Sequence, residues 1–303
     1  MKYLWFNKYP TIYKSITSNF STKTNTQSSL SKLRKQTGYS FLHCKNALLK
    51  FDGNISEAKK WLDVECMKKG WSKATKLDKK SLSQGIIYAY NTKNVGSLMF
   101  ELNCETDYVS KNDEFLNLAD KISKSLFEFM KNKCTESVHM INKDIKNVMV
   151  DDKSVFDSTS SLVGKIGENI FPRRAVFYKH QPENCIKYYI HQTNKSLNLS
   201  YGSRICNFAS LLRYKTNFKN TSYNEKEIDD IVNTLCQHIV GMNPIGIFPP
   251  KIKNEDDLNH KLDSFMINQN YLMDSEITIK ELLSETGIEL LDFCRYERGE
   301  LSK

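Results

Sequence analysis

The apolar positions of the first folded segment recur at helical spacing. Leu30 and Leu33 mark one face of a first helix, which Gly38 can end in the left-handed conformation. Ser40 is suited to cap the next helix, because its hydroxyl can accept from a backbone N–H group of the first turn. The apolar positions of that second helix are Phe41, Cys44, Leu48 and Phe51.

A third helix is predicted directly after the turn formed by residues 52–54. Asn54 and Glu57 have the spacing of a capping box, in which each side chain satisfies a backbone N–H group of the other. The inward positions of this helix are Ala58, Trp61 and Leu62. Residues 28–67 are therefore expected to form a compact three-helix unit. About 40 residues is near the lower limit for an independent fold, so its stability alone is expected to be marginal.

Residues 68–84 are rich in lysine and poor in large apolar side chains. This composition predicts either a solvated basic linker or an exposed helix. A nucleic-acid-binding arm is disfavoured, because aromatic residues for base stacking do not alternate with the lysines throughout the segment.

The pattern then changes from a helical period to the alternation of a β-strand. Ile86, Tyr88 and Tyr90 alternate with their neighbours. A turn over residues 91–94 and a second strand over residues 95–102 complete a predicted β-hairpin.

A long amphipathic helix follows the hairpin, and a similar order recurs later in the chain. Asp113 can cap the first long helix, whose apolar stripe is Phe115, Leu118, Ala119, Ile122, Leu126 and Phe129. Later strands are predicted over residues 175–178, 187–191 and 197–201, with a turn at 193–196. The second long helix has Ile228, Ile231, Val232, Leu235, Ile239 and Val240 on its inward face, and ends at Gly241 and Pro244.

This repetition predicts an α+β protein with two related α/β subdomains, in which antiparallel hairpin sheets pack on helices. The subdomains are expected over residues 85–150 and 151–303. A short helix over residues 279–286 and a strand over residues 288–296 complete the second one.

The positive charge of the chain is concentrated at its N-terminal end. The 303 residues include 44 Lys and Arg against 35 Asp and Glu, which gives a formal net charge of +9. Nine basic residues precede the first acid, Asp52, and this leaves 35 basic residues against 35 acidic ones from there on. A large surface that follows nucleic-acid phosphates would need an unbalanced charge in the folded part, so no direct nucleic-acid binding is expected.

Residues 1–27 have the composition of a mitochondrial import signal. They carry lysines between apolar residues, contain no acid and are rich in Ser and Thr. They lack the continuous apolar core of a secretory signal, so an amphipathic transit peptide is predicted, with a tail without a targeting role as the alternative. No stretch approaches the roughly 20 apolar residues of a membrane span, and no membrane association is expected.

The sequence lacks the motifs of common enzymes and metal sites. No two of the eight cysteines form a CxxC pair, and there is no GxxxxGK[ST], HExxH or GxSxG motif. We therefore expect reduced cysteines, no catalytic site, no metal and no cofactor. The string GKIG at residues 164–167 is similar to the GxxG loop of KH RNA-binding domains, although an ordinary small loop is the simpler interpretation.

Four segments in series resemble elongation factor Ts, the guanine-nucleotide exchange factor of elongation factor Tu. They are LRKQTGYSFLHCKNAL at 33–48, LMFELNCETDYVSKNDEFLNLA at 98–119, VGKIGENIFPRR at 163–174 and TIKELLSETGIELLDFCRYERG at 278–299. The first is similar to the ubiquitin-associated-like N-terminal domain of the family, and the second to its Thr-Asp-Phe-Val signature. The import-like start, and the lack of a long coiled-coil insertion before Tyr271, make the mitochondrial form the nearest match.

The resemblance implies a partner and a mechanism. It implies binding to the GDP-bound form of mitochondrial elongation factor Tu in the matrix, and release of GDP without covalent chemistry. The family's signature dipeptide, here Asp107 and Tyr108 flanked by Thr106 and Val109, enters the partner's GTPase domain near its Mg²⁺ site. The carboxylate is then expected to disturb the ligands of the Mg²⁺ ion, and the ring to separate helices of the partner. Because Tyr108 stands where the family has Phe, its hydroxyl is expected to reach water or a polar group of the partner.

The resemblance also implies contacts outside the signature, at Arg34, Phe41, Leu42, Ile170 and His238. Two adjacent bulky apolar residues after Ser40 cannot both face a three-helix core, so one of Phe41 and Leu42 is expected to be exposed. The alternatives are local packing for this pair and a structural role for His238. Likewise, outside its signature Asp107 would be interpreted as a loop cap and Tyr108 as a core aromatic residue.

Two other functions remain open at this point. Ubiquitin-associated modules in other proteins bind ubiquitin or nascent chains, so an interaction scaffold without exchange activity is one alternative. An RNA-binding protein that uses residues 164–167 and the lysine-rich segment is the other, and it is less favoured.

Overall fold

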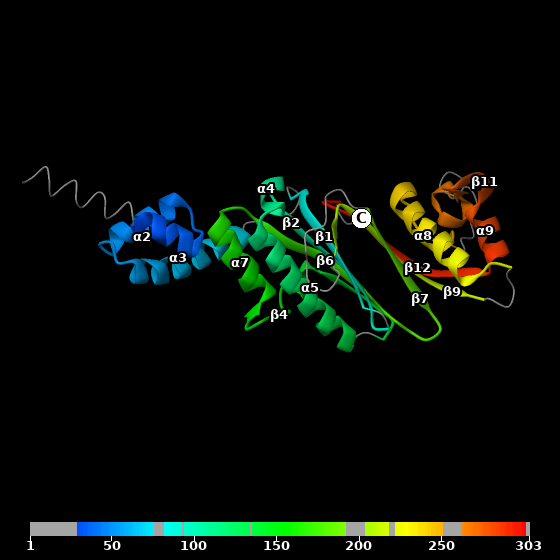
Figure 1. Ribbon diagram of the computed structural model, residues 1–303, viewed down its shortest axis with the longest axis horizontal. Coiled ribbons are helices and arrows are strands. Elements are labelled where there is room, and N and C mark those ends of the chain that lie inside the picture. The colour runs from blue at the N-terminus through cyan, green and yellow to red at the C-terminus, as the bar shows by residue number, and fades with distance from the viewer. Residues whose placement is uncertain are drawn as a thin grey trace, which may run out of the picture. The chain divides into compact units, whose positions relative to one another are not determined.

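The computed structural model (Figure 1) describes residues 29–75, 82–92, 94–133, 135–191, 204–217, 222–250 and 262–300. The import signal predicted over residues 1–27, and the turn and strand predicted over residues 193–201, lie outside them. The described chain divides into two compact units. Unit 1 contains the described part of Met1–Lys76 together with Ser160–Gly167, and unit 2 contains the other described residues.

Unit 1 contains the predicted helices. Residues 29–37 form the first, α2 spans Phe41–Lys50, and α3 spans Ile55–Thr75. Their shared core consists of Leu33, Tyr39, Cys44, Ala47, Leu48, Ala58, Leu62 and Cys66. Because α3 continues to Thr75, residues 68–75 of the lysine-rich segment are helical, as one of the two alternatives predicted; Lys68 and Lys69 are exposed, whereas Gly70 is buried.

The predicted helix ends of unit 1 are confirmed, but the capping box forms only its Asn54 half, because the backbone N of Asn54 donates to the carbonyl of Phe51 at 2.8 Å and not to Glu57. Gly38 has a φ of 68°, and its backbone N donates to the carbonyl of Arg34 at 2.8 Å. Ser40 Oγ accepts from the backbone N of His43 at 3.3 Å, which caps α2. Asn54 Oδ1 accepts from the backbone N of Glu57 at 3.3 Å, which caps α3.

The end of α7 (Val155–Ile166) packs closely on α3 within unit 1. A Cβ atom added at Gly164 would lie 2.0 Å from the backbone oxygen of Cys66, and one added at Gly70 would lie 1.9 Å from that of Ser160. The first glycine of the GKIG string therefore allows two helices to approach, and Gly167, with a φ of 88°, follows the end of α7. This geometry is a helix crossing and not a KH-type loop.

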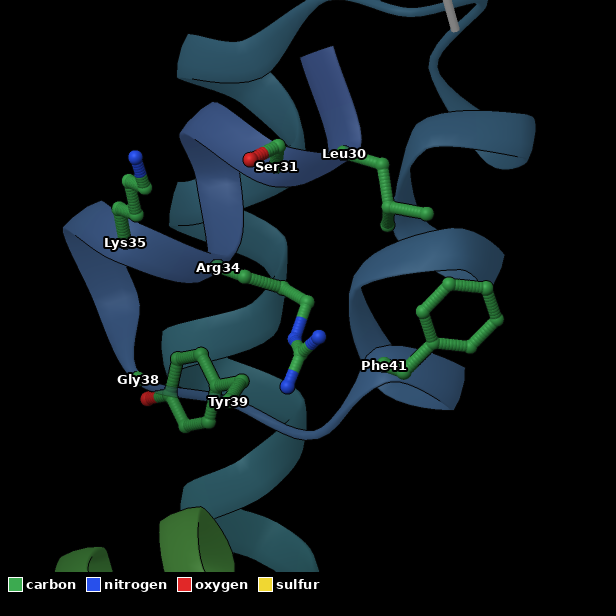
Figure 2. A pocket seen from close by; sticks show the side chains of 7 residues that line it. All are labelled: Leu30, Ser31, Arg34, Lys35, Gly38, Tyr39 and Phe41. Carbon is green, nitrogen blue, oxygen red and sulfur yellow. The ribbon is translucent and has the colours of Figure 1, made fainter. Parts of the chain in front are cut away.

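A pocket of about 410 Å³ opens between the first helix and the start of α2. Its lining residues are Leu30, Ser31, Arg34, Lys35, Gly38, Tyr39 and Phe41. Figure 2 shows the guanidinium of Arg34 reaching toward the space between Tyr39 and Phe41. The surface at this end of unit 1 therefore combines positive charge with an aromatic ring.

Unit 2 is built on two antiparallel sheets. The five-stranded sheet has the order β3-β6-β2-β1-β8 and consists of Ser137–Ile141, Ile170–Lys179, Gly96–Cys104, Gln84–Thr92 and Arg204–Cys206. The three-stranded sheet has the order β12-β9-β7 and consists of Ile288–Glu297, Phe208–Thr216 and Cys185–His191. The β1–β2 pair is the predicted hairpin. Strands β6 and β8 come from beyond residue 150, so this sheet joins segments from both sides of the expected subdomain boundary.

Helices and short elements complete unit 2. The helices are α4 (Asp107–Ser110), α5 (Asp113–Lys133), α6 (Asn142–Ile145), α8 (Glu225–Met242) and α9 (Ile279–Thr286), with 3₁₀ turns η4 (Leu262–Ser264) and η5 (Met266–Asn268). Two small sheets pair β4 (Met149–Val150) with β5 (Lys153–Ser154), and β10 (Asn270–Tyr271) with β11 (Asp274–Thr278). Among the described helices, none combines the length and the apolar character that crossing a membrane would require.

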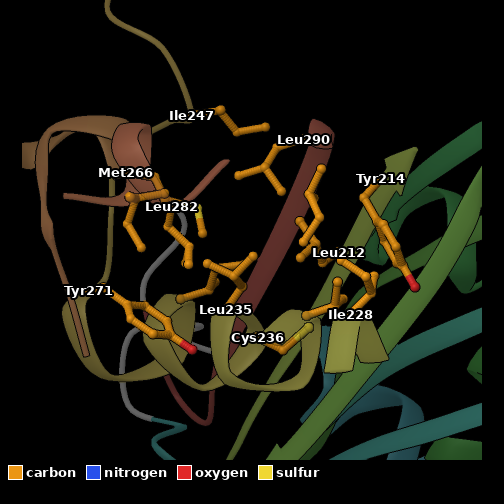
Figure 3. Close-up of a cluster of buried hydrophobic side chains, with 14 residues drawn as sticks. Leu212, Tyr214, Ile228, Leu235, Cys236, Ile247, Met266, Tyr271, Leu282 and Leu290 are labelled. Carbon is orange, nitrogen blue, oxygen red and sulfur yellow. The ribbon is translucent and has the colours of Figure 1, made fainter. Parts of the chain in front are cut away.

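The two sheets of unit 2 pack face to face between helices. Their shared core includes Ile87 and Met99 from the larger sheet and Leu211 and Tyr296 from the smaller one. Helix α5 covers the other face of the larger sheet. There the ring of Phe127 contacts the rings of Tyr90 on β1 and Phe177 on β6. Helix α8 and the C-terminal elements cover the other face of the smaller sheet (Figure 3). The predicted α+β class is confirmed.

Two local predictions need correction. The sequence pattern did not identify β9, although it is the central strand of the smaller sheet. Helix α5 is capped by Asn112 and not by Asp113, because Asn112 Oδ1 accepts from the backbone N of Glu114 at 2.8 Å and of Phe115 at 3.4 Å. The cap is one residue earlier than predicted.

Candidate partner-binding site

The short helix α4 follows directly from the end of a buried strand. Strand β2 ends at Cys104, which is fully buried, and burial raises the pKa of its thiol to about 12, so this cysteine stays protonated. Thr106 then caps α4, because its Oγ1 accepts from the backbone N of Val109 at 3.4 Å. Val109 is buried beneath the helix, and the hydroxyl of Ser110 donates to the carbonyl of Asp107 at 2.7 Å. These contacts fix the backbone of α4.

A second loop supports α4 from a distant part of the sequence. Thr106 Oγ1 donates to Glu168 Oε2 at 2.8 Å. Glu105 Oε1 accepts from the backbone N of Asn169 at 3.0 Å and from the side-chain amide of the same residue. Ile170 pairs with Cys104 in the sheet. The loop before β6 therefore holds the segment in front of α4 in place.

The signature dipeptide faces solvent. Tyr108 is 82% exposed, which is unusual for a large aromatic residue, and Asp107 beside it is also exposed. The alternative that Tyr108 is a core aromatic residue is therefore wrong. Water reaches the Tyr108 side chain in the free protein, and the ring offers apolar area that a partner can bury.

Lys111 forms an ion pair with Asp107. The distance from Lys111 Nζ to Asp107 Oδ2 is 2.8 Å, and both side chains are more than half exposed. The hydrogen bond from Lys111 lowers the pKa of Asp107 below its ordinary value. Asp107 is therefore a carboxylate at neutral pH.

Both apolar residues at the start of α2 are exposed. The exposed fraction is 53% for Phe41 and 62% for Leu42, although only one of them was expected on the surface. The reason is the start of the helix at Phe41, which leaves Cys44, Ala47 and Leu48 to face the core. Arg34 is exposed and lines the pocket beside Phe41 (Figure 2).

Ile170 and His238 lie inside unit 2. Ile170 is the first residue of β6 and is buried. His238 is fully buried on α8, with 2.8 Å between its Nε2 and Gln269 Oε1, and burial lowers its pKa. Neither side chain is available to a rigid partner surface, and the position of His238 favours the structural alternative.

Sequence reasoning missed several residues of the site. Glu105, Glu168 and Asn169 belong to resembling segments, but their mutual contacts join positions more than 60 residues apart. No periodic pattern encodes such contacts. Lys111 had a detectable signal, because a lysine four residues after an aspartate commonly forms an ion pair along a helix.

Comparisons with known proteins show which family the chain is similar to. The family model described as elongation factor Ts, mitochondrial, N-terminal, matches residues 13–72, and the one described as elongation factor TS matches residues 105–261. The mitochondrial elongation factor Ts of Aedes aegypti is 32% identical over 91% of this chain and 89% of its own. That of Branchiostoma floridae is 30% identical over 92% and 91%, and the human protein 29% over 89% and 82%.

Proposed function

The chain belongs to the elongation factor Ts family, the guanine-nucleotide exchange factors for elongation factor Tu in translation elongation, and we propose that its α4 loop drives GDP release from a mitochondrial elongation factor Tu in the matrix. One observation carries the proposal. The two residues at the family signature, Asp107 and Tyr108, protrude from a backbone that several hydrogen bonds hold in place.

In the proposed function, each residue of the α4 loop has a separate role in GDP release. Tyr108 inserts between helices of the partner's GTPase domain, where burial of its ring stabilises the complex. Asp107 places a carboxylate beside the partner's Mg²⁺ ion and competes with the metal's own oxygen ligands. Thr106 and Val109 fix the backbone between them, and Ile170 supports the same segment from strand β6. His238 acts at a distance, by holding α8 against Gln269.

Unit 1 supplies a second contact. Phe41 and Leu42 present adjacent apolar side chains, and Arg34 adds a positive charge close by. A surface of this composition fits an apolar partner patch with an acidic residue at its rim.

The proposed function requires binding of the factor and of GDP to oppose each other. Coupling between two ligands is reciprocal. The factor must therefore lower the partner's affinity for GDP by the same ratio as GDP lowers the partner's affinity for the factor. A coupling of about 3 kcal/mol corresponds to roughly a 150-fold change in either affinity.

Purification of the full chain with mitochondrial elongation factor Tu tests this directly. We expect the two proteins to co-elute without nucleotide and to separate when excess GDP is added. The affinity for GDP, measured with a fluorescent analogue, is expected to fall by roughly 150-fold when the factor is saturating. A complex that persists unchanged in excess GDP would show that the chain is a scaffold and not an exchange factor.

Removal of the apolar surface of α2 is expected to weaken the complex. Phe41→Ala with Leu42→Ala should raise the dissociation constant for the partner by about 30-fold, which corresponds to about 2 kcal/mol, or about 1 kcal/mol for each contact residue. The melting temperature should hardly change, because both side chains are exposed. Calorimetric titration measures the affinity, and Val64→Ala, which truncates an exposed residue of α3, is the control.

A further inference from the structure

Asp107 is held by a side chain of its own helix turn. Lys111 follows the last residue of α4 and donates from Nζ to Asp107 Oδ2 at 2.8 Å. The side chains of Lys111 and Asp107 are 63% and 51% exposed, so the ion pair lies at the surface and is open to solvent. An exposed ion pair at this spacing is weak and opens easily.

Two carboxylates contact the segment on the N-terminal side of Asp107 and its supporting loop. Glu105 and Glu168 contact the same short segment, and both accept hydrogen bonds from it or from the adjoining loop. Arg298 contributes positive charge on the buried side, near Cys104. On the exposed side, Lys111 is the cation that forms an ion pair with Asp107.

We propose that Lys111 is a positioning residue for nucleotide exchange, which holds and neutralises the Asp107 carboxylate until α4 has docked and then releases it to the partner's Mg²⁺ site. The inference rests on the function proposed above, and it adds a residue that acts through Asp107.

Electrostatics gives the physical reason for such a residue. The GDP-bound site of the partner contains phosphates, so a bare carboxylate is repelled once it comes within the Debye length of about 8 Å at physiological ionic strength. Lys111 removes most of that repulsion, because the Asp107–Lys111 pair has no net charge. Once the surfaces meet, Mg²⁺ is a stronger attraction for the carboxylate than an exposed ammonium group. The weakness of the pair is then useful, because little free energy is needed to open it.

A charge series at position 111 tests the inference. The rate of fluorescent GDP release from mitochondrial elongation factor Tu is measured against the concentration of the full chain, for Lys111→Arg, Lys111→Met and Lys111→Glu. We expect the half-saturating concentration to rise about threefold for Met and about tenfold for Glu, and to stay near the wild-type value for Arg. The maximal rate should stay within about twofold of wild type, because Asp107 is retained, and the differences should shrink at about 0.5 M salt.

Lys121→Met is the matched control. Lys121 lies on α5 and pairs with Asp151 at 2.9 Å, with side chains that are also exposed, so its loss removes an equivalent ion pair elsewhere in unit 2. A Met variant at 111 that behaves like this control would overturn the inference. So would a loss of maximal rate that salt does not change, since that result indicates structural damage. Asp107→Asn separates the two levels: if it stimulates release fully, the role of the Asp107 carboxylate in the proposed function is wrong, whatever the lysine variants do.

Discussion

Replacement of both Asp107 and Tyr108 by alanine is expected to lower the maximal rate of factor-stimulated GDP release by about 100-fold, which corresponds to about 2.7 kcal/mol. The variant removes the carboxylate and the ring to which the proposed function assigns competition for Mg²⁺ and separation of the partner's helices. Both side chains project from α4 into solvent, so the fold loses almost no packing. Stopped-flow measurement with a fluorescent GDP analogue, at saturating factor, gives the rate.

The matched control is Met149→Ala with Asp151→Ala. Met149 is an exposed apolar residue of β4, and Asp151 is an exposed acid paired with Lys121, so this variant removes the same two kinds of side chain from another surface of unit 2. It should stimulate release like the wild-type chain. If the Asp107 and Tyr108 variant also retains full stimulation, α4 is not the element that opens the nucleotide site.

The predictions from sequence succeeded where a local pattern determines the structure. Alternation predicted the β1–β2 hairpin, and helical spacing predicted α5, α8 and α9. Strand β9 was missed because it is central and covered on both faces, so Ala209, Leu211 and Leu212 are all buried and alternation is lost. The lysine-rich segment could not be assigned to a helix, because the close approach of Gly70 to Ser160 is a tertiary contact.

The candidate site could also be predicted only in part: single residues followed from local sequence, and contacts between distant residues did not. The family signature identified Asp107 and Tyr108. The reasoning about adjacent apolar residues anticipated the exposure of one of Phe41 and Leu42, although both are exposed. The contact of Thr106 with Glu168 depends on how two distant loops meet, and only the folded structure shows it.

Glu101→Gln is expected to destabilise unit 2 by about 3 to 5 kcal/mol, because a buried ion pair that loses one partner leaves an uncompensated charge. Glu101 is fully buried, with its Oε2 2.7 Å from Arg174 Nε and its Oε1 3.7 Å from Arg173 Nε. Its Oε1 also accepts from the backbone N of Gly299 at 2.7 Å. Glutamine keeps the shape of the side chain but removes the charge that both guanidinium groups face. The melting temperature should fall by about 10 °C, measured by calorimetry.

The same substitution at the surface should have almost no effect. Glu128→Gln removes an ion pair with Lys131 at 2.6 Å on α5, and its side chain is 61% exposed, so the expected change is below about 1 kcal/mol. Equal melting temperatures for both variants would mean that water or the remaining hydrogen bonds compensate the positive charge of Arg173 and Arg174. A large difference would show that the charge of Glu101 stabilises the fold through the two arginines of β6. Because α4 begins only a few residues after Glu101, the contacts of Glu101 with Arg173 and Arg174 also hold the end of β2 that leads into α4.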